Sequence, residues 1–459
     1  RYLLKHHYQT PKTIKNRIKE ENKNFQDYLD DQLLVESWKS SMIVTTFVQL
    51  FHSLIGNKNR FLKKFHHMVN SIVILDEIQN IDPKFYLLTK KVFKILAERF
   101  NLYFLQITAT QPEIIDKDKT LQLIDTDKYM KNKLINRVEL DIYPEKIEIE
   151  LFLDNFLHTF NDANCLIVVN TKTTAKTIYD QIHREFSRNY EIFCLTTNLI
   201  PKDRKKQIKQ IDNLLLNNEN VIVISTQLIE AGVDLSFKTV FRDLAPLESI
   251  IQVAGRCNRN GELGRLAGKM KLINLDNNRI YPKILLQYVR EILKKSKYQS
   301  IEFHNLTSLY FKLFNFTIES EKLMKAIKDL NYDKKIEGQT PVSDFKLINT
   351  NPTENIYVMT DKTAQKNMDK FLELRNQIKL STSKIEKNEI RIEIEKIKHK
   401  LQPYQISVYP NYLIDYRDQL QPEEEILNNK DYPYKFIPFE IQKEYDKKEK
   451  LGFLKEPKK

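Results

Sequence analysis

Short runs of apolar, mostly β-branched residues recur along residues 42–275, and stretches with helical spacing separate them. The clearest run, Ile72–Leu75, lies within the sequence SIVILDEIQ at positions 71–79. A short apolar run without polar alternation is typical of a strand buried on both faces of a parallel sheet. Strands of this kind that alternate with helices predict an α/β fold with a doubly wound sheet.

Two acidic residues, Asp76 and Glu77, follow the Ile72–Leu75 run directly. Ligands bind at the carboxyl ends of strands in open α/β sheets, where an Asp can hold Mg²⁺ on nucleotide phosphates while a following Glu orients an attacking water. A strand that ends in an ordinary acidic turn gives the same pattern. The motifs further along the chain favour the nucleotide site.

Charge and cysteine usage narrow the class of protein. The formal net charge of +13 favours a polyanionic partner, usually nucleic acid, although AT-rich coding could also supply part of the abundant Lys, Ile and Asn. The charged fraction of 29% and the absence of a long apolar run exclude a membrane span. Cys165, Cys194 and Cys257 are odd in number and lack metal-ligand spacing, so we expect buried thiols in a reducing cytoplasm.

The order of these patterns predicts four regions. We expect an incomplete sheet domain over residues 1–135, a second sheet domain over 143–285, a linker region over 286–375 and an accessory domain over 376–459. The second domain should contain strands at Cys165–Val169, Ile192–Leu195, Val221–Ile224, Thr239–Phe241 and Lys271–Leu275. In the tail, Ile390, Ile394, Ile397 and Leu401 recur at helical spacing. The dense charge around that stripe favours a solvated helix face, with direct DNA contact as the alternative.

Polar residues follow another expected strand, Met42–Val44. Thr45, Thr46 and Gln49 stand between this strand and a helix. Hydroxyls and amides at such a position can bond to phosphate oxygens without reading base sequence. A Thr there can also cap the helix, and both roles can hold together.

Two arginines, Arg256 and Arg259, lie three residues apart on a helical stretch and so project to one side. Arginines in such positions can stabilise the transition state of phosphoryl transfer. A solvated helix face is the alternative. Gln252, four residues before Arg256, and the flanking glycines favour the arginine-finger interpretation.

Four stretches together resemble the motifs of a superfamily 2 helicase core: DEIQ (motif II), TAT at 108–110 (motif III), STQLIEAGVDLSF (motif V) and QVAGRCNRNG (motif VI). The residues of these motifs are similar to those of Cas3, the helicase component of type I CRISPR systems. The resemblance covers residues 1 to about 275 with specific motifs and the remainder more loosely. It implies two RecA-like doubly wound parallel-sheet domains, the first incomplete, followed by a helical or mixed C-terminal accessory region.

The resemblance also implies an antiviral function and its partners. Members of this family use ATP and Mg²⁺ to move along single-stranded DNA in the cytoplasm, and the Cascade surveillance complex recruits them to target DNA. Asp76 would bind Mg²⁺ and Glu77 would orient water, with Gln252, Arg256 and Arg259 reaching the phosphates. The residues that would couple nucleotide state to the strand are Thr108, Thr110, Glu230, Gly232 and Asp234. Those that would lie along the DNA backbone are Thr45, Thr46, Gln49, Asn170, Thr171, Ser225 and Thr226.

The sequence departs from the family pattern in one large respect, because it contains no glycine-rich phosphate loop with Lys and Ser/Thr. The segment Gly264–Met270 is one residue too short and ends in Met. We expect the loop before Arg1, and residues 1–459 alone to be inert as an ATPase. No His-Asp dipeptide occurs, so an accompanying HD nuclease would be fused upstream or separate.

Two other functions stay open. A catalytically dead nucleic-acid-binding scaffold could retain the helicase fold, and a repair or RNA helicase of superfamily 2 would share the motifs. Motifs II and VI favour the motor, because a scaffold has no chemical use for Glu77 or Arg259. CRISPR subtype, polarity of movement, oligomeric state and the Cascade-binding surface are not determined by the sequence.

Overall fold

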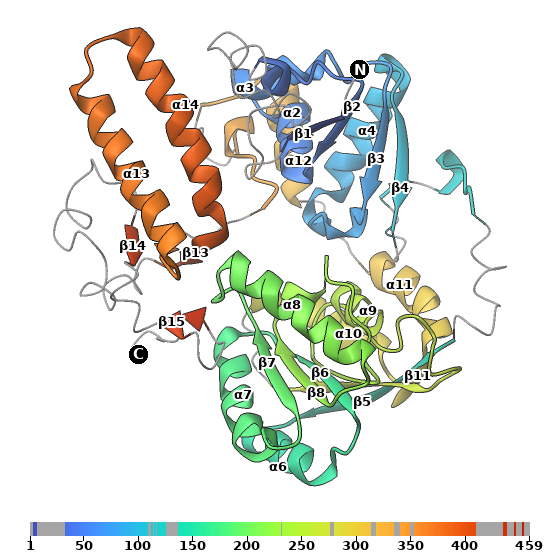
Figure 1. Cartoon of the computed structure of the whole chain (residues 1–459). Coiled ribbons are helices and arrows are strands. Elements are labelled where there is room, and N and C mark those ends of the chain that lie inside the picture. The colour runs from blue at the N-terminus through green and yellow to red at the C-terminus, as the bar shows by residue number, and fades with distance from the viewer. Residues whose placement is uncertain are drawn as a thin grey trace. The chain divides into compact units, whose positions relative to one another are not determined.

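The structure is a computed structural model, and it describes residues 3–6, 33–108, 112, 114–115, 117–124, 136–230, 232–275, 280–313, 318–334, 340–348, 353–409, 435–437, 445–446 and 452–453. The chain forms two compact units: one from residues 1–119, 314–351 and 363–402, the other from 120–313, 352–362 and 403–459. Both are of the α/β type, with parallel strands (Figure 1). Across these described residues, no helix combines the length and apolarity that a membrane span requires.

Within its described residues, the first unit contains two pairs of parallel strands. Strand β1 (Leu3–His6) pairs with β2 (Met42–Thr45), and β3 (Ile72–Asp76) pairs with β4 (Tyr103–Ile107). The α-helices in the described part of this unit are α2 (Phe47–Ile55), α3 (Asn59–Phe65), α4 (Tyr86–Phe100), α12 (Ile318–Lys328), α13 (Lys362–Leu380) and α14 (Lys384–Leu401). The expected strand at Met42–Val44 is therefore confirmed, with its end shifted by one residue.

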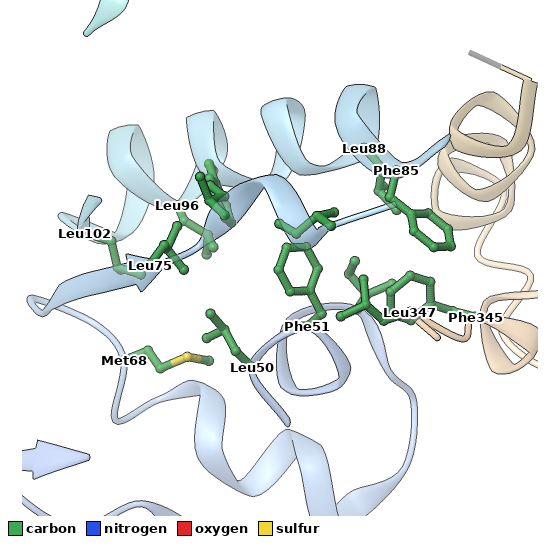
Figure 2. Packing of buried hydrophobic residues seen from close by; sticks show 14 of the residues in the cluster. Leu50, Phe51, Met68, Leu75, Phe85, Leu88, Leu96, Leu102, Phe345 and Leu347 are labelled. Atoms are coloured by element: carbon green, nitrogen blue, oxygen red, sulfur yellow. The ribbon is translucent and has the colours of Figure 1, made fainter. Parts of the chain in front are cut away.

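One face of the β3–β4 pair carries the core of the first unit. Leu75 on β3 packs with Leu96 of α4 and Leu50 of α2 in one hydrophobic cluster (Figure 2). Leu323, Ala326, Val342, Phe345 and Leu347 belong to the same cluster, although they come from the range 286–375 that we expected to be a linker.

The other face of this strand pair is exposed. Ile72 and Ile74 on β3 are 71% and 61% exposed, and Tyr103 on β4 is 64% exposed. We predicted a strand buried on both faces, and this prediction is wrong for β3 as the structure has it. The side chains of a strand alternate between faces, so only Val73 and Leu75 face the cluster described above.

The second unit is built on a seven-stranded sheet in the order β11-β5-β10-β9-β6-β8-β7. All neighbours are parallel except β11 and β5. The strands are β5 (Val138–Lys146), β6 (Asn164–Val168), β7 (Glu191–Leu195), β8 (Val221–Ser225), β9 (Thr239–Asp243), β10 (Gly268–Asn274) and β11 (Lys297–Gln299). All five predicted strands of this region are confirmed, with ends shifted by a few residues.

Helices flank this sheet in sequence, as the alternating pattern predicted. They are α6 (Ile149–Thr159), α7 (Lys172–Phe186), α8 (Pro201–Leu216), α9 (Leu247–Ala254), α10 (Lys283–Ile292) and α11 (Phe303–Lys312). A cluster of buried side chains from α6 and α7 packs with residues of β6, β7 and β8. Strands β6 and β8 are buried along nearly their whole length, which agrees with their unbroken apolar sequence.

Smaller sheets lie in the last part of the chain. Strand β12 (Glu354–Val358) pairs with β13 (Gln405–Val408) in antiparallel fashion and with β14 (Lys435–Ile437) in parallel. Strands β15 (Tyr445–Asp446) and β16 (Gly452–Phe453) form an antiparallel pair.

All three cysteines are buried and free of disulfides, as their spacing predicted. Cys165 lies on β6 and Cys194 on β7, whereas Cys257 follows α9. Burial raises the pKa of the Cys194 and Cys257 thiols to about 12 and raises that of Cys165 well above its usual range. These thiols therefore serve as apolar packing groups.

Candidate functional site

The acidic pair lies where the sequence placed it, at the carboxyl end of β3. Asp76 is exposed there, and Glu77 follows with φ 54° and ψ 46°, in the left-handed region. The Glu77 amide donates to the carbonyl of Ile107 on β4 at 2.9 Å. A non-glycine residue in this conformation costs about 1 kcal/mol or more, and such strain concentrates at functional sites.

A chain of side-chain hydrogen bonds connects Glu77 to the end of β4. The Gln79 side-chain amide donates to a carboxylate oxygen of Glu77, and the Thr108 hydroxyl donates to the Gln79 side-chain oxygen. Gln79 is buried. Two predicted site residues, Glu77 and Thr108, are thus linked through a third, whereas Thr110 lies outside the described residues.

Three further residues of the first unit were predicted to contact DNA. The Thr45 hydroxyl donates to the carbonyl of His6 at 2.8 Å, and Thr46 caps α2 by accepting from the amide of Gln49 at 3.3 Å. The Gln49 side-chain oxygen accepts from Lys64 at 3.0 Å. Burial and the nearby Arg60 lower the pKa of Lys64 to about 8. The structure brings these residues together at the carboxyl end of β2 and the start of α2.

In the second unit, motif V is held by a buried arginine. Arg242 on β9 is fully buried, and its Nη2 donates to the Glu230 carboxylate at 3.0 Å and to the Ser249 hydroxyl at 2.8 Å. The Ser249 hydroxyl in turn donates to the same Glu230 oxygen at 2.6 Å. The other terminal nitrogen of Arg242 donates to the side-chain oxygen of Asn170 at 2.8 Å. Glu230 is therefore fixed from two elements.

Burial changes the protonation behaviour of the acids in this cluster. It raises the pKa of Glu230, against the opposing effects of Arg242 and Ser249. It also raises the pKa of Asp243 to about 6 and that of Glu248, in the first turn of α9, to about 7. Desolvation disfavours the charged form of a carboxyl, so Glu248 is partly protonated near neutral pH.

The two arginines of motif VI both contact motif V. Arg256 is buried and donates from Nε to the carbonyl of Ile229 at 3.1 Å and from Nη2 to that of Glu230 at 2.7 Å. Arg259 is more exposed and forms an ion pair with Asp234 at 2.5 Å. Their environments thus differ. The helical stretch that we expected for both arginines is wrong, because α9 ends at Ala254 and both residues lie in the turns that follow it.

Two more predicted residues lie near these arginines in sequence. Gly232 has φ 74°, a left-handed conformation that glycine adopts without strain. Gln252 lies on α9 and is partly buried.

The remaining predicted DNA contacts lie at the carboxyl ends of β6 and β8. Asn170 is buried and donates to the carbonyl of Leu244 at 2.8 Å, and Ser225 is buried and donates to that of Leu195 at 2.8 Å. Thr171 caps α7 by accepting from the amide of Thr174 at 3.1 Å. Thr226 is also largely buried. In this conformation Asn170 and Ser225 serve interior contacts.

The donor set at β3 fits Mg²⁺ and nucleotide phosphates. An exposed carboxylate beside a second one at a strand end supplies hard oxygen ligands, and Mg²⁺ is usually held by one or two carboxylates together with substrate phosphates. Among the described residues, no cluster of three or more His, Cys, Asp or Glu side chains could hold a metal on its own.

Sequence reasoning missed Gln79, Arg242 and Ser249 as members of the site. The Gln79 signal was present, because the residue closes the DEIQ motif. Arg242 and Ser249 carry no such signal, since neither stands in a helicase motif that we identified.

Parallel sheets with acidic and basic side chains gathered after their strands define an α/β protein of the kind that binds ligands at strand ends. Residues 161–262 match a family model described as the C-terminal part of CRISPR-associated nuclease/helicase Cas3. The Cas3 of Haloferax volcanii is 26% identical, over 58% of this chain and 38% of that protein. The Cas3 of Methanothermobacter thermautotrophicus is 25% identical, over 58% of this chain and 35% of that protein.

A solved structure of T. fusca Cas3 matches with a TM-score of 0.60 at 14% identity, over 95% of this chain and 58% of that one. A T. fusca Cas3 structure with AMPPNP matches with a TM-score of 0.59 at 14% identity, over 89% and 55%. The chain is similar in sequence to the Cas3-like CRISPR-associated nuclease/helicases. It spans a little over a third of the length of the two curated relatives.

Proposed function

We propose that the chain is part of an ATP-dependent translocase or helicase that moves along single-stranded DNA in CRISPR interference. Its two α/β units would be the two RecA-like domains of the motor. The Cas3 relatives support the family, and a matching chain belongs to a structure titled "CRISPR RNA-guided surveillance complex, pre-nicking". We therefore propose that the motor acts in the cytoplasm on target DNA that Cascade has bound. An HD nuclease would be either fused to this motor or a separate protein.

The observation that carries this proposal is the hydrogen-bonded series from Glu77 through Gln79 to Thr108. A carboxylate that must orient a water molecule needs a fixed direction, and Gln79 together with the left-handed backbone at Glu77 supplies it. Thr108 begins the motif III segment after β4. A shift of that segment would pull on Gln79 and change the direction of the Glu77 carboxylate, which is how strand contact would be coupled to hydrolysis.

Asp76 and Glu77 divide the chemistry at β3 between them. Asp76 would hold Mg²⁺, which neutralises the negative charge that develops on the phosphates of ATP. Glu77 accepts a hydrogen bond from the attacking water and keeps it directed along the line of attack. In the second unit Arg256 fixes the backbone of motif V, while Arg259 is the candidate finger, because a guanidinium paired with an exposed carboxylate can exchange that partner for a phosphate.

The DNA track would use residues at strand ends in both units. The hydroxyls of Thr46 and Thr171 accept backbone amide hydrogens as helix caps. A hydroxyl that accepts with one lone pair still carries a hydrogen to donate, so these two residues could bind backbone phosphates while they cap. Thr45, Gln49 and Thr226 would extend the track, whereas Asn170 and Ser225 would support it from the interior, given their buried contacts.

The main alternative is a nucleic-acid-binding scaffold without catalysis. It accounts for the fold and the positive charge but gives no reason for strain at Glu77 or for its link to Thr108. A repair or RNA helicase would use the same site residues and differ in substrate.

Replacing Glu77 by Gln tests the proposal. The amide keeps the shape of the side chain but cannot orient water as a carboxylate does, so ATP turnover should fall by at least about 10²-fold while DNA binding stays within about threefold. The assay measures phosphate release with and without single-stranded DNA, on a polypeptide that contains this sequence together with a phosphate loop, because residues 1–459 contain none.

Glu98→Gln is the matched control, since Glu98 lies on the exposed surface of α4 and pairs weakly with Lys94 at 3.8 Å. It should leave turnover unchanged. A wild-type protein with no ATPase activity would favour the scaffold. Turnover by Glu77→Gln close to wild type would remove Glu77 from the catalytic role.

A further inference from the structure

The helices α13 and α14 form an antiparallel hairpin with a buried apolar seam. Ser383 caps α14 by accepting from the amide of Glu386 at 3.4 Å, which ends the turn between the helices. The seam consists of Ala364, Met368, Phe371 and Leu374 on α13 and Ile390, Ile394, Ile397 and Leu401 on α14. The predicted stripe of the second helix is therefore confirmed. Figure 1 shows the two helices running side by side.

Near the turn the hairpin opens into a groove of about 380 Å³, and basic side chains from both helices line it. Its charged residues are Arg375, Lys379, Lys387, Arg391 and Lys398, against the single acid Glu395. Glu395 is engaged by Lys398 at 2.8 Å. The groove therefore carries a strong excess of positive charge on both walls.

The spacing of these residues follows the helix repeat. Arg375 and Lys379 are four residues apart on α13, and Lys387 and Arg391 are four apart on α14, so each pair lies on one face about 6 Å apart along its axis. Two parallel rows of cations at such spacing suit a polyanion that runs along the groove.

The floor of the groove is apolar. Ile378 and Ile394 line it between the two basic rows, and Ile394 is buried. An apolar strip beside cations suits a nucleic-acid strand whose bases are unstacked, because a duplex hides its base faces inside the helix. A purely acidic protein segment matches the charge but offers no flat apolar group to this floor.

We propose that this groove binds the backbone of single-stranded nucleic acid, as a contact separate from the polar residues at the strand ends of the two sheets. Its residues belong to the α13–α14 hairpin and to no motif identified in the sequence. We had favoured a solvated charged face for residues 384–401, and the basic groove shared with α13 is the reason to revise that interpretation. Binding of nucleic acid in this groove requires no ATP, so this proposal can be tested independently of the ATPase activity.

The test is a salt titration of binding to a fluorescein-labelled oligothymidine without ATP. Lys387→Gln combined with Arg391→Gln should weaken binding and make the slope of log K against log salt shallower by about 1.4, which is about 0.7 for each of the two phosphates that is no longer neutralised. The matched control is Lys366→Gln with Lys396→Gln, which removes the same charge from exposed positions of α13 and α14 outside the groove. It should leave the slope within about 0.3 of wild type.

Three outcomes would overturn the proposal: equal slopes for the groove and control variants, equal loss of binding to a duplex of the same length, or equally strong competition by polyglutamate. Circular dichroism of both double variants checks that α13 and α14 remain helical. The substitution Leu380→Trp, at an exposed position in the last turn of α13, supplies a second readout. Its fluorescence should change on adding the oligothymidine in the otherwise wild-type chain and stay constant in the groove variant.

Discussion

Arg242 offers the sharpest test of how the second unit is held together. Its guanidinium is fully buried and contacts Glu230, Ser249 and Asn170 at 2.8 to 3.0 Å. Replacing it with Met keeps a side chain of similar length but removes every donor. Glu230 then remains buried without its cation, and Asn170 loses a donor to its side-chain oxygen.

The expected cost follows from these two losses. Removing one partner of a buried ion pair costs about 3–5 kcal/mol, because the other charge is left uncompensated. A domain is stable by only about 5–15 kcal/mol, so Arg242→Met should bring the second unit close to unfolding. The loss should be smaller at low pH, where Glu230, whose pKa burial already raises, can take up a proton.

The same reasoning predicts partial rescue. In the Arg242→Met background, Glu230→Gln removes the uncompensated charge and should recover about 2 kcal/mol. Lys176→Met is the control, because Lys176 pairs with Asp180 on the surface of α7 at 2.6 Å and its loss should cost less than about 1 kcal/mol.

Hydrogen exchange of peptides from β6, β8 and β9 measures opening of the second unit. Trp38, the single tryptophan of the chain, is buried in the first unit, so its fluorescence provides an internal reference that should not change. If Arg242→Met destabilised the unit equally with Glu230 intact and with Glu230→Gln present, the argument that the uncompensated carboxylate causes the loss would be refuted.

Two further predictions concern Glu248 and Arg259. The folded-state pKa of Glu248 is raised to about 7. The folded chain therefore holds the Glu248 proton more tightly than the unfolded chain does. The resulting stabilisation of the fold is fully present below pH about 4.5 and is lost as the pH rises to about 7, at a cost of up to about 3 kcal/mol. Glu248→Gln should flatten the dependence of thermal unfolding on pH in this window, and an unchanged dependence would exclude Glu248 as its source. Arg259→Ala in the complete polypeptide should lower kcat by about 10³-fold or more with a smaller effect on KM; a rise in KM alone would make Arg259 a ground-state ligand.

Five strands of the seven-stranded sheet in the second unit could be predicted because their signals are local, whereas β5 and β11 were not predicted. The apolar runs that became β6 and β8 contain no polar interruption. Helices α7 and α8 likewise begin at local signals, since Thr171 caps the first and Pro201 begins the second. The acidic pair and the two arginines could be singled out as candidates because each stands in a compact motif.

The missing parts of the site depend on contacts between distant residues. In the sequence, Arg242 is only a polar residue near the end of a strand. Its burial is explained by its contacts with Glu230 and Asn170, which lie 12 and 72 residues away. No periodicity carries that information. The exposed face of β3 was also unpredictable, because Ile72 and Ile74 have the same apolar character as the buried Leu75. Helix α12 reaches the first core from more than 200 residues downstream, at a distance where local patterns give no guidance.

The three buried cysteines allow opening of the second unit to be measured by alkylation. All of them lie in that unit, buried, and their raised pKa values leave almost no thiolate for reaction at neutral pH while the fold is closed. A maleimide or iodoacetamide added to the folded chain can react with them only after an opening that exposes β6, β7 or the segment after α9. The rate of alkylation therefore measures the opening of this unit alone. A cysteine introduced on an exposed helix face could be labelled before the native thiols react.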